Sequence, residues 1–216
     1  KFFLYIWCNN PKKPHSQFMG IFDKIFGKKK QDSSEKKDEQ GKYMPKEDIP
    51  VDELFTLNFM KNGGKFIYCD STEEVETNFS DILKENNWNN NNVLCHDAVL
   101  KAKFKSFNLK YNNQEPAFFL TTCESLIADK GSILISSNQI KEQKLDELPQ
   151  NFVLFATTSQ LKETISEGLR AIKNNKEKQI PSNITTLKHF KSLKENDFMT
   201  YGSSTKNLYL LLLEDL

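Results

Sequence analysis

The six residues Leu208–Leu213 (LYLLLL) decide the fold. A strand with one face in water alternates apolar and polar residues, and this run contains no polar position. It therefore predicts a strand buried on both faces, as in a parallel sheet covered on both sides. Four similar runs precede it: Lys65–Cys69 (KFIYC), Ala117–Leu120 (AFFL), Gly131–Ser136 (GSILIS) and Phe152–Ala156 (FVLFA).

Helical patterns separate these runs. Ser71–Glu74 (STEE) predicts a capping box, followed by a helix with the inner face Val75, Phe79, Ile82 and Leu83. Asp97 is expected to cap a helix through Phe104, and a short apolar helix is expected over Asp52–Met60. Thr158 is expected to cap a helix over Gln160–Lys173, with the inner face Leu161, Ile165, Leu169 and Ile172. The alternation predicts an α/β fold with a mostly parallel sheet and helices on both faces.

The 216 residues divide into four parts. Residues 1–18 precede Met19-Gly20, which resembles a genuine start, so we interpret them as translated upstream sequence. Residues 19–30 predict a short amphipathic helix. Residues 31–49 are polar and charged and predict a disordered linker. Residues 50–216 are expected to form the α/β domain.

The segment 20–30 carries an apolar stripe, Ile21, Phe22, Ile25 and Phe26, beside several lysines. This pattern fits weak peripheral contact with an anionic membrane, or docking on protein. The apolar run Lys1–Cys8 is too short to cross a bilayer, so no transmembrane segment is expected.

Composition argues against several other classes. The net charge of +1 gives no electrostatic case for nucleic-acid binding. No two of the four cysteines form a C-x-x-C pair, so neither a metal site nor a cofactor is expected in this chain. Scattered single cysteines favour a reducing compartment, here the cytoplasm.

A family resemblance rests on Thr121–Ser137 (TTCESLIADKGSILISS). The acidic residue, the Ile-Ala, the aspartate and the Gly-Ser before an apolar strand resemble the core of the LUD (lactate utilisation) domain family. Leu145–Pro149, Asn151–Phe155 and Ser159–Leu161 follow in the family's order. The opening MGIFDKIFGKKK and the ending NLYLLLLED are similar to short flavobacterial members.

The resemblance implies a fold like that of sugar-phosphate isomerases, CoA-transferases and formyltetrahydrofolate cyclo-ligase. It also implies a relation to the C subunit of bacterial lactate-utilisation complexes, in which separate partner subunits carry iron–sulfur clusters. The chain departs from the family in two loops. Pro181–Phe190 stands where a Gly-Pro-Ser stretch is typical, and Tyr201–Lys206 stands where a Gly-x-His-Gly-Pro turn is typical.

In a parallel sheet, ligands bind beyond the carboxyl ends of the strands. Glu124 and Asp129 follow the AFFL run and are the candidate acid and base, although Asp129 also fits a tight turn. Gly131, Ser132, Ser136 and Ser137 are candidate ligand-binding residues around the GSILIS run. Ser136, Ser137 and the following Asn138 fit an ordinary polar strand exit equally well.

Two further loops complete the candidate site. Thr157, Thr158 and Ser159 follow the FVLFA run and suit either an anion or ordinary helix capping. A second loop could close over an anionic substrate or form a plain turn, and it contains Gly202, Ser203, Ser204 and Lys206.

Three functions remain open. The first is a non-redox accessory subunit in lactate or organic-acid utilisation, which binds a small anionic ligand or iron–sulfur oxidoreductase subunits. The second is a stand-alone isomerase- or ligase-like enzyme that acts on a small phosphorylated or carboxylated substrate. This function requires Glu124 or Asp129 to converge with Lys206. The third is a non-catalytic interaction module with a degenerate site.

Overall fold

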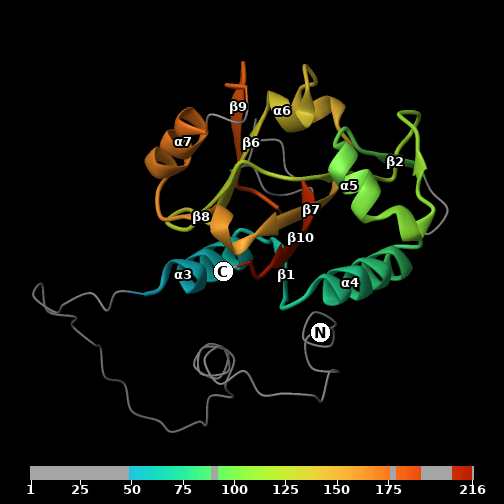
Figure 1. The fold of residues 1–216 in the computed structure, drawn as a ribbon, viewed down its shortest axis with the longest axis horizontal. Helices are drawn as coiled ribbons and strands as arrows, with labels where there is room; N and C mark the ends of the chain where they lie inside the picture. The colour runs from blue at the N-terminus through green and yellow to red at the C-terminus, as the bar shows by residue number, and fades with distance from the viewer. Residues whose placement is uncertain (1–48, 89–91, 176–178, 191–205, 216) are drawn as a thin grey trace, which may run out of the picture. The chain divides into compact units, whose positions relative to one another are not determined.

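The computed structural model describes residues 49–88, 92–175, 179–190 and 206–215. Its centre is a six-stranded sheet in the order β1-β10-β7-β4-β2-β3, in which every neighbouring pair is parallel (Figure 1). The strands are β1 (Lys65–Cys69), β2 (Asn92–Leu94), β3 (Lys110–Tyr111), β4 (Phe118–Thr121), β7 (Asn151–Thr157) and β10 (Asn207–Leu213). The predicted parallel α/β sheet is confirmed.

Apolar residues face both sides of this sheet. Within β10, Tyr209 and Leu211 belong to one core cluster, whereas Leu208, Leu210 and Leu212 belong to the other. Since successive side chains of a strand point to opposite faces, an uninterrupted apolar run fills two cores at once. The residues of LYLLLL are therefore explained by burial on both faces.

Helices cover the first face. The helix α4 (Thr72–Glu85) is capped by Ser71 and buries Val75, Phe79, Ile82 and Leu83, as predicted. The short helix α5 (Ala98–Lys103) follows its cap, Asp97, and packs beside α4 in the same cluster.

The second face is covered by the helix α3 (Val51–Lys61) and by a second sheet. This four-stranded sheet has the order β8-β5-β6-β9, with β5 (Ser125–Ile127), β6 (Ser132–Ser136), β8 (Leu161–Lys162) and β9 (Ile184–Leu187). The GSILIS run thus forms β6, which pairs antiparallel with both β5 and β9 outside the parallel sheet. Layered packing buries this strand on both sides, which explains why its sequence resembles the parallel strands.

The helix α7 (Ile165–Asn174) lies on the outer side of the second sheet (Figure 1). The expected helix over Gln160–Lys173 is wrong at its start. Thr158–Gln160 forms a 3-10 turn, β8 follows, and the cap is Thr164, whose side chain accepts from the backbone N–H of Glu167. Leu169 is also not on the inner face, because it is 42% exposed. Gly168 takes the inner position, where an added Cβ would lie 2.8 Å from Leu134.

The chain leaves β2 and β4 on opposite faces of the parallel sheet. After β2 it enters α5, which belongs to the first face, and after β4 it enters β5 of the second sheet. Neighbouring parallel strands whose connections diverge in this way leave a crevice at their carboxyl ends. The fold therefore leaves a crevice between the carboxyl ends of β2 and β4.

Three predicted segments are the upstream sequence (1–18), the amphipathic helix (19–30) and the linker (31–49). Apart from Ile49, they lie outside the described residues. Among the residues that are described, no helix has the length and apolar character to cross a bilayer.

Candidate functional site

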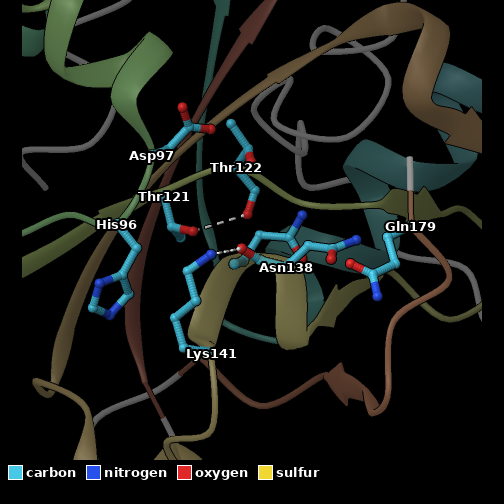
Figure 2. A pocket seen from close by; sticks show the side chains of 8 residues that line it. His96, Asp97, Thr121, Thr122, Asn138, Lys141 and Gln179 are labelled. Atoms are coloured by element: carbon cyan, nitrogen blue, oxygen red, sulfur yellow. Dashed lines mark hydrogen bonds between the residues drawn. The ribbon is translucent and has the colours of Figure 1, made fainter. Parts of the chain in front are cut away.

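A polar pocket occupies the crevice between the ends of β2 and β4 (Figure 2). Its volume is about 320 Å³, which is at the small end of the range for ligand sites. The lining residues come from the ends of the two strands, from the helix α6 (Ser137–Ile140) and from the segment before β9. They are His96, Asp97, Thr121, Thr122, Asn138, Gln139, Lys141 and Gln179.

On the β2 side of the pocket, Asp97 is held in place because it caps the start of α5. One carboxylate oxygen of Asp97 accepts from the backbone N–H groups of Val99 and Leu100, at 2.7 and 3.2 Å. His96 Nε2 lies 3.0 Å from Gln143 Oε1, and its ring meets Phe119 edge-on. These contacts fix both side chains at the mouth of the crevice.

The β4 side of the pocket carries two threonines. The buried Thr121 ends the strand, and its hydroxyl donates to the carbonyl oxygen of Thr122 at 3.2 Å. This bond folds the backbone directly after the strand, and both residues line the pocket (Figure 2).

The third wall is α6, whose start is built around Glu124. Ser136 caps the helix in a capping box with Gln139. One oxygen of Glu124, Oε1, accepts from Ser136 Oγ at 2.6 Å, Gln139 Nε2 at 3.0 Å and Asn138 Nδ2 at 3.1 Å. The structure thus places Glu124 directly behind two residues that line the pocket.

Lys141 follows α6 in an unusual backbone conformation, with φ 58° and ψ −133°. A side chain at positive φ is strained, and such strain clusters at functional positions. Its ammonium group donates to the backbone oxygen of Asn138 at 3.3 Å, which holds a positive charge beside the pocket (Figure 2).

Glu124 and Asp129 lie at opposite ends of the β5–β6 hairpin. Asp129 and Gly131 are in its turn, which docks on α3 through the side-chain amides of Asn58 and Asn62. Gly131 has φ +56°, and an added Cβ would lie 2.2 Å from the backbone of Asn58. The structure therefore does not bring the expected acid and base together.

The Thr157–Ser159 loop already holds an anion, the side chain of Asp215. The carboxylate of Asp215 accepts from Thr158 Oγ1 at 2.8 Å, from the backbone N–H of Ser159 at 2.9 Å and from Ser159 Oγ at 2.7 Å. Burial acts to raise the pKa of Asp215, but the hydrogen bonds from Ser159, Thr158 and Thr157 outweigh it and lower the pKa to about 2. The expected anion site is thus occupied by the chain itself.

Lys206 precedes β10 and lies at the amino end of the sheet. Its ammonium group donates to the carbonyl oxygens of Leu148 and Pro149 at 2.9 and 3.1 Å, and burial lowers its pKa. Since the pocket lies at the carboxyl end, Lys206 does not converge with Glu124. Gly202, Ser203 and Ser204, from the same expected loop, lie outside the described residues.

The remaining candidates, Ser132 and Ser137, do not line the pocket. The hydroxyl of Ser132 is fully buried and has no hydrogen-bond partner among the described residues. Ser137 is the first residue of α6, and its hydroxyl accepts from the backbone N–H of Ser182. No group of three or more metal-binding side chains forms within the described ranges.

Sequence reasoning missed most of the pocket. The pocket residues that were not among the predicted site residues are His96, Asp97, Thr121, Thr122, Gln139, Lys141 and Gln179. For the two threonines a signal was present, because they stand directly after the AFFL run, where a parallel strand ends. Gln179 lacked any signal, since only the tertiary fold brings it to β2 and β4.

A parallel sheet covered on both faces, with a polar crevice where its connections diverge, defines an α/β protein, and in this class ligands commonly bind at such a crevice. A sequence profile of the LUD domain matches residues 53–213, so the chain belongs to the LUD domain family. The chain is also similar to the crystal structure of a DUF162 family protein from Deinococcus radiodurans. The TM-score is 0.54 at 13% identity, over 76% of this chain and 96% of that chain. Among curated proteins, none matches this sequence.

Proposed function

We propose that this LUD-domain chain is a non-redox, ligand-binding component of organic-acid utilisation, and that it holds a small carboxylate in the pocket between β2 and β4. The family supports the metabolic context, because LUD stands for lactate utilisation. The observation that carries the proposal is the polar pocket itself, at the place where a parallel sheet binds ligands.

The chemistry of the pocket fits a small polar anion. Lys141 supplies a cation, and the threonine hydroxyls and amide side chains supply further hydrogen-bonding groups. The carboxylate of Asp97 is partly offset by the backbone N–H groups that it caps. A ligand that combines a carboxylate with other polar groups matches this set.

Calorimetric titration of the full chain with lactate and with glycolate tests the proposal. We expect Lys141→Met to weaken binding about tenfold, because a hydrogen bond to a charged group contributes about 1.5–3 kcal/mol. Lys130→Met is the matched control, since Lys130 is an exposed lysine in the β5–β6 turn, away from the pocket. Absence of binding by the wild-type chain, or equal binding by Lys141→Met, would contradict the proposal.

We place the electron-carrying iron–sulfur clusters in separate partner subunits, in line with the family resemblance. Co-purification of an iron–sulfur protein with the tagged full chain from its own cells tests this part. The stand-alone enzyme is less favoured, because Glu124, Asp129 and Lys206 occupy three separate places in the fold.

A further inference from the structure

We propose that Glu124 is a positioning residue that turns the side-chain oxygen of Asn138 toward the ligand, so that the pocket selects carboxylates carrying a neighbouring hydroxyl or ammonium donor. This inference rests on the proposed function, since it names the ligand class of the same pocket.

The argument begins at a backbone N–H group. The N–H of Ser136 donates to Gln139 Oε1 at 2.8 Å, which fixes the orientation of the Gln139 amide. Its other end, Nε2, must then be the donor that meets Glu124 at 3.0 Å. The group at position 124 is thereby required to be an acceptor.

The same carboxylate oxygen orients Asn138. Asn138 Nδ2 donates to Glu124 Oε1 at 3.1 Å, whereas a reversed amide would set its oxygen against a carboxylate oxygen. Since the nitrogen of the amide faces Glu124, the oxygen is directed away from it. Asn138 lines the pocket (Figure 2), and we infer that the side-chain oxygen is the acceptor that it offers to a ligand there.

The acceptor lies beside a cation. Lys141 Nζ is 3.3 Å from the backbone oxygen of Asn138, and both residues line the pocket. A ligand with a carboxylate for Lys141 and an adjacent donor for Asn138 satisfies both. A carboxylate without the donor does not form this hydrogen bond to Asn138, and one such bond contributes about 0.5–1.5 kcal/mol.

Glycolate and acetate are the probes, because they differ only in the hydroxyl group. We expect the wild-type chain to bind glycolate about tenfold more tightly than acetate, the effect of one hydrogen bond. Glu124→Leu and Asn138→Ala should each remove this preference, and the double variant should remove no more than either alone. Glu124→Gln should retain it, because Gln139 still requires an acceptor at position 124.

The Lys141→Met variant separates the two parts of the recognition. It should weaken glycolate and acetate equally and leave their ratio unchanged. A preference that survives in Glu124→Leu, or that is lost in Glu124→Gln, overturns the inference while the carboxylate pocket stands.

The side-chain amide resonances of Asn138 provide a readout without any ligand. In the wild-type chain and in Glu124→Gln they should show slow solvent exchange, and in Glu124→Leu exchange should become fast. If neither acid binds, the proposed function fails, and these resonances alone decide whether Glu124 orients Asn138. Unchanged exchange in Glu124→Leu overturns the positioning role.

Discussion

Lys141 combines a charged side chain with a backbone conformation that suits glycine. The structure describes three other non-glycine residues at positive φ, Asn87, Asn108 and Glu115, and two of these are asparagines, which tolerate such angles. Lysine has no such tolerance, so its presence beside the pocket indicates a role for the side chain.

Lys141→Gly should therefore separate stability from binding. We expect the free energy of unfolding to rise by about 1 kcal/mol as the strain is relieved, while carboxylate binding weakens. Urea unfolding and calorimetric titration measure the two effects. Glu115→Gly is the matched control, because Glu115 is exposed at φ 45° and does not line the pocket. A destabilised Lys141→Gly variant with unchanged binding would refute this prediction.

Asp215 predicts a pH dependence at the residue scale. Its pKa is about 2 in the folded chain and about 4 in an unfolded chain. A lowered carboxyl pKa stabilises the fold above the unfolded value, and this contribution disappears as the pH falls from about 4 to about 2. Unfolding free energies of the wild type and Asp215→Asn should differ at pH 6 and converge near pH 2. A constant difference would speak against the Asp215 contacts.

At the scale of elements, the β5–β6 hairpin depends on its turn. Gly131 has φ +56° and lies in close contact with the backbone of α3. An added methyl group would have no space there, and the backbone angle is disfavoured for any residue with a side chain. We expect Gly131→Ala to lower the free energy of unfolding by about 2 kcal/mol or more. Lys130→Ala, in the same turn but exposed, should change it by less than about 0.5 kcal/mol. Equal effects in denaturant unfolding would contradict the packing argument.

The same hairpin shows which features of the fold a local sequence pattern predicts and which it does not. The runs that form β1, β4, β7 and β10 have apolar residues on both faces, which favours parallel strands. The run in β6 is just as apolar, but pairing depends on distant partners such as β9, which a local pattern does not specify. The crevice is equally non-local. The sequence predicts Glu124 and Ser136 at the same edge of the sheet. It does not predict their hydrogen bond or the position of Lys141, because both depend on how the β5–β6 hairpin packs on the rest of the fold.

At the scale of the whole molecule, Ile49–Leu216 form one compact unit, and both large core clusters of the described residues lie within it. We therefore expect a chain that begins at residue 49 to unfold cooperatively in denaturant and to bind the same carboxylates as the full chain. Near-ultraviolet circular dichroism and calorimetric titration check this. A shortened chain without cooperative unfolding would show that the core needs the preceding residues.

The sheet order has a consequence for biosynthesis. β10 lies between β1 and β7, so Lys65 pairs with Tyr209, 144 positions later. Until the ribosome has released these late residues, β1 has no neighbour in the sheet and β7 presents an open edge. Pairing across so long a stretch is slow and leaves unpaired strands prone to association. The nascent chain should consequently depend on chaperones during translation until its final strand emerges.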